Sequence, residues 1–391
     1  MPGGDRNDGD RHGIPALHHD GKPLAPDPPG SRRPGMVADM TRRIAASAGS
    51  PADPPLAVTA LTDPTQLPDL VPDWWGLWHI AENPLPFTSP GWLVAWWRHL
   101  GGGPLCVLTV RDRSRLIAVL PMFGHEGPEG ARLLPLGISV SDMFDLLVAP
   151  GRTEEAVTAL AAALAGFRCY RCEFHEVPAS SALCSLARRT TVQSTAPVLD
   201  VPRFASLSAR AGPQRRLRRA QGIAAMADLV LDRPGSEAME SLFILHGLQW
   251  HARGEEGVLA ARNLQNFHIE AARELERAGA LRLHRIRHHD RTIAMLYGFH
   301  VRGRTYAYLS GTDPDYARLS LGTVLIGAAI EAAHAEGARE FDFLRGPEPY
   351  KYAWGAVDRP LLRLDLGLPA RTRAPHRPPA ERARSRRAVP A

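Results

Sequence analysis

An internal repeat between residues 105 and 345 constrains the fold more than any other feature of the sequence. "PLCVLTV" and "RLIAVLPMF" are β-rich runs separated by "RDRS", and "LRLHRIR" and "TIAMLYGFHV", separated by "HHDR", repeat that arrangement. Each copy continues through a further strand, a loop, a helix (about 153–165 or 321–336) and another strand. Antiparallel strands that lead through a helix to another strand are typical of a mixed sheet. The repeat therefore predicts an α/β (α+β) fold of two tandem mixed-sheet domains flanked by helices.

Composition sets the domain limits. Residues 1–55 and 367–391 are rich in Pro or Arg and lack apolar periodicity, so we predict that both are disordered tails. The repeat divides the remainder into a first domain, 56–200, and a second domain, 201–366.

The net charge of +6 lies in the C-terminal tail, where residues 367–391 hold seven arginines and one glutamate. Such a tail is typical of a solvated end, so we expect no specific nucleic-acid partner. "RRLRRA" could bind phosphates, but a solvated helix face is the favoured interpretation. No stretch approaches the ~18–20 apolar residues of a membrane-spanning helix, and the start lacks the apolar core of a signal peptide. We therefore expect no transmembrane segment and a cytoplasmic location.

Two clusters of residues suggest sites but have simpler interpretations. Cys169, Cys172, His175 and Cys184 have zinc-like spacing, yet "CYRCEFHEV" alternates as a strand does, and we predict no metal. Six of the eight tryptophans lie within residues 74–97. They could form a stacking platform for sugars or bases, but core packing is the favoured interpretation.

A loop in the second copy has the pattern of an anion site. The chain leaves a strand at about Ser310, passes turn-forming residues and enters a helix at about Leu321, with Gly322 in the first turn. The first N–H groups of a helix lack intrahelical acceptors, and glycine allows a ligand to approach the backbone. This pattern predicts a phosphate-binding loop.

Longer motifs carry a resemblance to a known family. They are "PFTSPGWLVAWW", "IAVLPMF", "SDMFDLLVAPG", "WHARGEEGVLA", "IAMLYGF", "YLSGTDPDYARLSLGTVLIGAAIEAA" and "FDFLRGPEPYKYAWG". Over about 74–366 the chain resembles the CelD/BcsL-type GNAT acyltransferases, which are associated with exopolysaccharide synthesis. The resemblance implies two GNAT-like domains and acetyl-CoA, or another acyl-CoA, as co-substrate. It also implies a small-molecule amine or sugar as acceptor and association with a polysaccharide synthesis complex. The expected function is acyl-CoA-dependent N-acyl transfer.

The resemblance also implies where the acyl donor binds. GNAT proteins hold its pyrophosphate with a Gln/Arg-x-x-Gly-x-Gly/Ala loop, which aligns with residues 318–323; this chain lacks the first glycine and ends the loop with threonine. The predicted donor-binding residues are Ser310, Gly311, Arg318, Ser320, Leu321, Gly322 and Thr323. At the equivalent helix start in the first copy, Glu154 and Glu155 would repel a pyrophosphate, so we expect that copy to be degenerate.

Lys351 is, apart from Lys22, the only lysine in a chain with 47 basic residues. It could be a remnant of compositional drift. Alternatively it lines the cleft between donor and acceptor and contacts a substrate phosphate or carboxylate, which a compact ammonium suits better than a planar guanidinium. The predicted catalytic residues are Asp342, Tyr350 and Lys351, with Glu348 as another candidate base; an ion-pair role for Asp342 is the alternative.

Four further residues are predicted to bind substrate: Trp250, Arg253, Arg345 and Tyr352. Arg253 could hold an anionic acceptor or the donor phosphates, or simply end a helix before Gly254. Two other functions remain open. One is Fem-type aminoacyl transfer from tRNA, and the other is a non-catalytic assembly factor of a polysaccharide machine.

Overall fold

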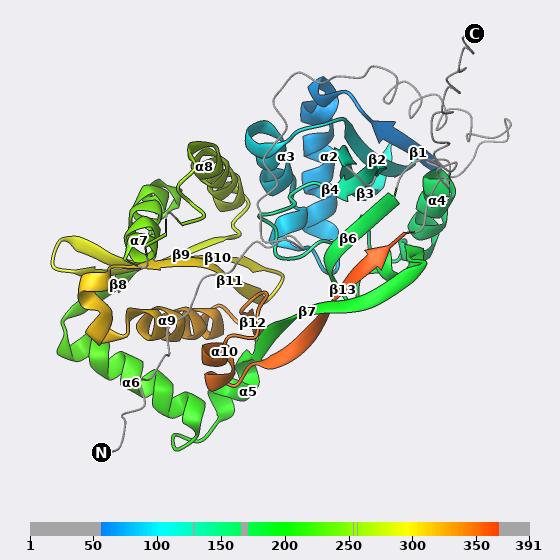
Figure 1. Cartoon of the computed structure of the whole chain (residues 1–391). Coiled ribbons are helices and arrows are strands. Elements are labelled where there is room, and N and C mark those ends of the chain that lie inside the picture. The colour runs from blue at the N-terminus through cyan, green and yellow to red at the C-terminus, as the bar shows by residue number, and fades with distance from the viewer. Residues whose placement is uncertain (1–55, 128–129, 166–170, 253, 256, 367–391) are drawn as a thin grey trace, which may run out of the picture.

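The computed structural model describes residues 56–366 apart from 128–129, 166–170, 253 and 256, and its strands form one mixed sheet (Figure 1). The strands are β1 (Ala57–Leu61), β2 (Leu105–Asp112), β3 (Arg115–Gly127), β4 (Gly130–Pro135), β5 (Leu147–Val148), β6 (Arg171–Pro178), β7 (Arg189–Asp200), β8 (Leu229–Asp232), β9 (Leu281–His288), β10 (Arg291–Val301), β11 (Arg304–Thr312), β12 (Glu340–Asp342) and β13 (Val357–Asp365). Their order is β1-β2-β3-β4-β6-β13-β7-β12-β11-β10-β9-β8, with β5 paired to β3.

The α-helices are α2 (Leu67–Ile80), α3 (Pro90–Leu100), α4 (Thr153–Ala165), α5 (Val201–Ser206), α6 (Gly212–Met226), α7 (Met239–His251), α8 (Arg262–Arg277), α9 (Leu321–Ala335) and α10 (Pro349–Ala353). Short 3-10 helices span Pro64–Gln66, Pro86–Thr88, Ala182–Leu186, Ser236–Ala238 and Pro314–Leu319. Among the described residues, no helix combines the length and apolarity needed to cross a bilayer.

The strand order repeats about the middle of the sheet, which confirms the mixed α/β fold predicted from the repeat. Outward from the centre, one half runs β13, β6, β4, β3, β2, β1 and the other runs β7, β12, β11, β10, β9, β8. β4 and β6 pair in parallel, as do β11 and β12, whereas the other pairs are antiparallel. Each half thus contains one parallel pair of strands, β4 with β6 or β11 with β12, beside a run of antiparallel strands.

The two central strands are exchanged between the halves. β7, from the predicted first domain, pairs with β12 of the second half. β13, from the predicted second domain, pairs with β6 of the first half. The chain therefore crosses between the halves twice, and a cut at residue 200 would not separate two complete sheets.

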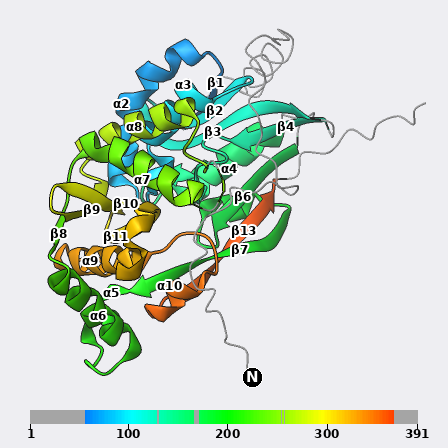
Figure 2. The ribbon, with the colours of Figure 1, turned by 60° about the vertical axis from the view of Figure 1, so that its left-hand side comes forward.

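Helices cover both faces of the second half. α7 and α8 lie on one face and α9 on the other, with α6 packed outside α9 (Figures 1 and 2). α8 also packs against α3 of the first half, and the rings of Trp92 and Phe267 meet edge to face at 4.8 Å. One apolar core therefore runs through both halves on the α7 and α8 face.

The tryptophan-rich segment is core, as the favoured interpretation held. Trp74 and Trp92 are fully buried, and their indole N–H groups donate to Thr88 O and Ser141 Oγ. The Ser89 hydroxyl caps α3 by accepting from Trp92 N, with Pro90 in the first turn. The indole nitrogens thus find partners inside the protein, as buried tryptophans usually do.

The cysteine-rich segment forms β6, in agreement with its alternation. Cys172 is buried, with its Sγ 3.8 Å from Met122 Sδ, whereas Cys169 lies outside the described residues. In the part of the chain that the structure describes, no three His, Cys, Asp or Glu side chains form a group suited to a metal ion.

Candidate functional site

The strands β11 and β12 separate soon after they meet. They pair in parallel only from Arg304 with Glu340 to Tyr306 with Asp342. Beyond that point β11 continues to Thr312, while residues 343–346 follow β7 through bonds from Phe343 N to Pro197 O and from Gly346 N to Thr195 O. Ligands in open α/β sheets bind outside the carboxyl ends of strands where neighbours diverge. This divergence is therefore the candidate site.

A bulge lies on the open stretch of β11. Its partner strand β10 places Tyr297 opposite Leu309 and Gly298 opposite Ala307, so Tyr308 is the extra residue. A bulge interrupts the ladder and turns backbone groups out of it. The Tyr308 hydroxyl crosses to the first half and donates to Val140 O at 2.6 Å.

Helix α9 begins beyond the same carboxyl end of β11. Ser320 adopts a left-handed conformation (φ 50°, ψ 47°), and its carbonyl accepts from Thr323 N and Val324 N. Within the described residues, the N–H groups of Leu321 and Gly322 have no acceptor. A side chain at Gly322 would meet no atom within 4 Å. The helix start therefore has two free donors, open space and the positive end of the helix dipole.

The other predicted donor-binding residues have different positions. Arg318 is exposed and has no ion pair in the described part of the chain, and Ser310 is exposed on β11. Leu321 is buried in the core beneath the helix start. Gly311 faces α7, where a side chain would lie 2.6 Å from His246 N. Gly311 therefore serves the packing of α7 onto the sheet, and Leu321 can contribute only its backbone.

The corresponding helix start in the first half carries acidic groups. α4 begins with Thr153, Glu154 and Glu155, and Arg152 donates to both Glu155 and Asp112. Two acidic residues in the first turn disfavour an anion at this helix start, and Arg152, just before the helix, is already paired.

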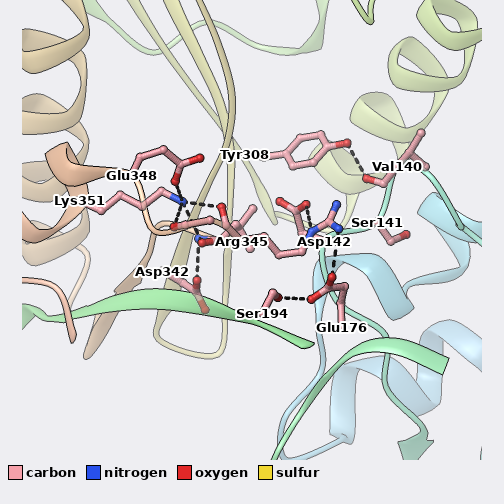
Figure 3. Close-up of polar contacts among 12 residues, drawn as sticks. Val140, Ser141, Asp142, Glu176, Ser194, Tyr308, Asp342, Arg345, Glu348 and Lys351 are labelled. Carbon is pink, nitrogen blue, oxygen red and sulfur yellow. Dashed lines mark hydrogen bonds and ion pairs between the residues drawn. The ribbon is translucent and has the colours of Figure 1, made fainter. Parts of the chain in front are cut away.

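Lys351 is buried beside the divergence rather than lining an open surface. It is 1% exposed, and its Nζ donates to the carbonyls of Leu344 (3.0 Å), Arg345 (2.6 Å) and Gly346 (3.0 Å). Its ammonium also pairs with Glu348 Oε2 at 2.8 Å (Figure 3). Burial lowers the pKa of Lys351, although the Glu348 carboxylate opposes that change. Three carbonyls accept from the ammonium and Glu348 pairs with it as an ion, so none of its three protons remains for a substrate.

The segment around Lys351 is a short helix, α10, and not extended chain. Pro349, in the first turn of α10, favours helix initiation. Tyr350 is largely buried, with its ring 6.0 Å from Phe343, and burial raises its pKa. Tyr352 is 37% exposed and donates to Asp358 Oδ1. The two tyrosines therefore do not share the face opposite Lys351, as extended backbone would require.

Asp342 lies at the last paired position of β12, where the two strands part. Its Oδ1 accepts from Leu344 N at 2.8 Å, and its side chain is buried. Burial raises the pKa of Asp342 to about 6, and that hydrogen bond opposes the rise. A carboxyl group with this pKa exchanges protons near neutral pH, as a general base must.

Arg345 joins the halves through residues that the sequence analysis did not select. Its Nε donates to Asp142 Oδ1 at 2.8 Å, and its Nη1 reaches Glu176 Oε1 at 3.5 Å (Figure 3). The hydroxyl of Ser194 donates to the other Glu176 oxygen. Asp142 belongs to "SDMFDLLVAPG", where two aspartates stand among apolar residues, and that was the one available signal. Pairing partners 203 residues apart leave no local pattern.

Two predicted substrate residues lie elsewhere. Trp250, on α7, donates from Nε1 to His246 Nε2 at 2.9 Å and covers Gly257. Arg253 lies outside the described residues.

A cavity of about 410 Å³ lies between α3 and α8 and is lined by Arg98, Glu270 and other residues of those helices. None of its lining residues is labelled in the cluster of Figure 3.

Known proteins resemble this chain in a sequence family and in the fold. Residues 208–352, which include β11, α9, β12 and most of α10, match the family described as Acetyltransferase (GNAT) domain. A search of curated proteins found no match. Among solved structures, FemX superposes with a TM-score of 0.54 at 10% identity, over 76% of this chain and 94% of FemX.

Two other solved structures are similar to this chain. One is the C-terminal domain of a putative lysylphosphatidylglycerol synthetase from Agrobacterium fabrum (TM-score 0.52, 12% identity, 77% of this chain and 92% of that one). The other is a conserved protein of unknown function from Bacteroides thetaiotaomicron (TM-score 0.54, 12% identity, 78% and 99%). At these identities the likeness shows the fold, and the matched domain supports a transferase.

Proposed function

Because the chain has a GNAT-superfamily fold related to that of FemX, we propose that its second half transfers an acetyl group from acetyl-CoA to an amino group of a small molecule or sugar. The observation that carries this proposal is the divergence of β11 from β12 beyond Tyr306 and Asp342, with the free start of α9 at the same end. A thioester lying along the open stretch of β11 would place its phosphates toward that helix start.

The residues at the start of α9 suit the phosphates of the donor. Two backbone N–H groups, at Leu321 and Gly322, point out of the helix without acceptors in the described chain. Arg318, exposed three residues before the helix, adds a mobile positive charge. Backbone donors, a helix dipole and one arginine are the usual elements of a pyrophosphate site.

The reaction needs few groups from the protein. The acceptor ammonium first loses a proton, for which Asp342, with a pKa of about 6, is the candidate base. The amine nitrogen then attacks the thioester carbonyl, and backbone N–H groups at the Tyr308 bulge would stabilise the developing oxyanion. The carbon–sulfur bond breaks, and the thiolate takes up one proton. The products are the amide and free coenzyme A.

Lys351 has a positioning role in this proposal. Its Nζ donates to the carbonyls of residues 344–346 and so fixes the direction in which the Arg345 side chain leaves the backbone. Tyr350 is partly buried beside the same segment and stays a candidate acid for the leaving thiolate, as predicted.

A Fem-type aminoacyl transfer is the second candidate, favoured by the superposition on FemX. The exposed arginines of α6, Arg215, Arg218 and Arg219, would then contact tRNA phosphates. A link to exopolysaccharide synthesis, with or without catalysis, remains a proposal that rests on the family resemblance alone.

Thermal unfolding with acetyl-CoA, followed by an assay of thiol release with D-glucosamine, spermidine and L-lysine as acceptors, tests the proposal. A ligand at 100 times its Kd stabilises by about 2.7 kcal/mol, so binding will be visible as a higher Tm. A protein that ignores acetyl-CoA but binds aminoacyl-tRNA would support the Fem-type function instead. Binding of acetyl-CoA without thiol release would favour the assembly factor.

A further inference from the structure

The cluster at the divergence holds more buried negative than positive charge. Besides Asp342, whose Oδ1 accepts from Leu344 N, the cluster contains three carboxylates, on Asp142, Glu176 and Glu348, and two cations, on Arg345 and Lys351, which leaves at least one negative charge in excess (Figure 3). Lys351 is matched by Glu348. The excess therefore falls on the group in which Arg345 alone faces both Asp142 and Glu176. Buried charge without a partner is costly, and proteins normally neutralise it.

One oxygen in this group lacks a partner. Asp142 is 2% exposed; its Oδ1 accepts from Arg345, but its Oδ2 has no hydrogen-bond donor. Both oxygens of Glu176 are used, by Arg345 Nη1 and by the Ser194 hydroxyl. The excess charge can therefore be assigned to Oδ2 of Asp142.

The loop around Asp142 is fixed against the second half. The carbonyl of Val140 accepts from the hydroxyl of Tyr308, the extra residue in the β11 bulge, and Ser141 Oγ accepts from Trp92 Nε1. Asp142 lies close to Tyr308. Burial is the main cause that raises the pKa of the Tyr308 phenol, and the Asp142 carboxylate raises it further. The unpaired oxygen thus lies next to the stretch of β11 where the thioester is proposed to bind.

From these contacts we infer that Asp142, supplied by the first half of the chain, binds the acceptor as a protonated primary amine through Oδ2. This inference rests on the proposed function and adds to it the charge of the acceptor and the residue that recognises it. An ammonium group neutralises the excess charge and supplies the missing donor in one step. The first half, whose own helix start carries Glu154 and Glu155, then has a defined part in catalysis.

A nearby aspartate in the same loop offers a matched control. Asp145 is also largely buried, but both of its contacts, from Ser181 Oγ and Leu146 N, lie inside the first half. Asp142→Asn and Asp145→Asn therefore make the same chemical change three residues apart, and only the first touches the second half.

Melting curves without ligand test the excess charge independently of any reaction. Asp142→Asn keeps an acceptor for Arg345 Nε and removes the surplus charge. Its Tm at pH 7 should therefore lie between the wild-type value and ~2 °C above it. A Tm well below the wild-type value would show that Asp142 is a structural partner of Arg345 and would overturn the inference.

Amine titrations then test recognition. D-glucosamine, spermidine and L-lysine are added to each protein, and both Tm and thiol release from acetyl-CoA are measured. For any amine that the wild type uses, Asp142→Asn should raise the amine KM about 10- to 100-fold, the loss expected for one hydrogen bond to a charged group, and leave the acetyl-CoA KM unchanged. Asp145→Asn should leave the amine KM unchanged.

The two proposals fail in different ways. If the wild type binds amines, seen as a higher Tm that Asp142→Asn abolishes, yet never releases coenzyme A, the acetyl-transfer proposal fails and the inference stands. If the wild type turns over an amine with the same KM in both aspartate variants, the inference fails and acetyl transfer stands. If no amine of the three raises the wild-type Tm or is acetylated, the inference is also overturned.

Discussion

The ammonium of Lys351 donates a 2.6 Å hydrogen bond to the backbone carbonyl of Arg345, the residue whose guanidinium reaches the first half of the protein. The same ammonium holds the carbonyls before and after Arg345. One buried lysine therefore sets the backbone from which the contact between the halves is made. This relationship gives the single lysine of the folded part a role that needs no contact with substrate.

Replacement of Lys351 should lower stability as well as activity. Lys351→Met leaves Glu348 and three carbonyls without their partner, so we expect a loss of about 3–5 kcal/mol in the free energy of unfolding. Lys351→Arg keeps the charge but brings a planar, wider group to a point where three carbonyls converge, at a cost of about 1–3 kcal/mol. Urea unfolding measures both values.

The neighbouring Tyr352→Phe is the control, because its hydroxyl contacts only Asp358 at the surface among the described residues. If Lys351 instead contacted a substrate, Lys351→Arg would keep a normal fold and lose about 10²-fold in activity. An Arg variant with wild-type stability and that loss of activity would return Lys351 to the role of a substrate contact.

Gly322→Glu should weaken the binding of coenzyme A without unfolding the protein. The glycine has ordinary helical backbone and open space around the position of a side chain, so the fold tolerates the change. The new carboxylate would lie at the helix start, where it repels a pyrophosphate, and we expect at least a ~10-fold weaker Kd by calorimetry.

Gly322→Ala should bind coenzyme A nearly as the wild type does. Gly212→Glu, at the open start of α6, adds the same charge at another helix start and serves as the control. Equal affinity in Gly322→Glu and Gly212→Glu would remove the start of α9 from the donor site.

Asp342→Asn should change stability in a pH-dependent way. The folded-state pKa of about 6 exceeds the ordinary value of 3.8, so the native state binds the proton more tightly than the unfolded state does. The stability that this group contributes is complete below pH 3.8 and is lost as pH rises through 6. The Asn variant should therefore match the wild type near pH 4 and exceed it by up to about 3 kcal/mol at pH 7.

The activity of the same variant separates the two interpretations of Asp342. If Asp342 is the base, wild-type thiol release should rise through about pH 6, and the Asn variant should lose that limb together with most of its rate. An Asn variant with a normal rate and the same pH profile would leave Asp342 as a structural carboxyl group that accepts from Leu344 N.

A chain trimmed to residues 56–366 should keep its Tm and its affinity for acetyl-CoA, because every strand and helix described lies inside those limits. A chain ending at residue 356 should not fold, since it lacks β13, the strand between β6 and β7. Circular dichroism melting of the two truncated proteins compares these outcomes. An unstable 56–366 protein would show that the terminal segments contribute to the fold.

Local signals in the sequence were enough to predict many elements of the fold. The helix predicted at about 153–165 matches α4, and the loop with Gly322 placed the start of α9 at Leu321. The capping residue Ser89 and the first-turn Pro90 of α3 are local features of the same kind. Each of these features depends on neighbours within about four residues, so the sequence carries it directly.

The same sequence was misleading where a residue's surroundings come from distant parts of the chain. Lys351 was expected at an open cleft because its rarity suggested a task, and the task that the structure supports is the binding of three backbone carbonyls. Gly311 was expected near the donor, but α7 occupies that side of the strand. Burial on a given side is decided by the packing of other elements, which local pattern does not record.

By itself, the sequence determined the repeat, the mixed α/β class, the helix starts and the loop that leads into α9. Only the tertiary structure decided that β7 and β13 change places between the halves and that Arg345 pairs with Asp142. The physical reason is the range of the interactions. Helix capping and hairpin turns are satisfied within a few residues, whereas the pairing of β7 with β12, of β13 with β6 and of Arg345 with Asp142 joins groups more than a hundred residues apart.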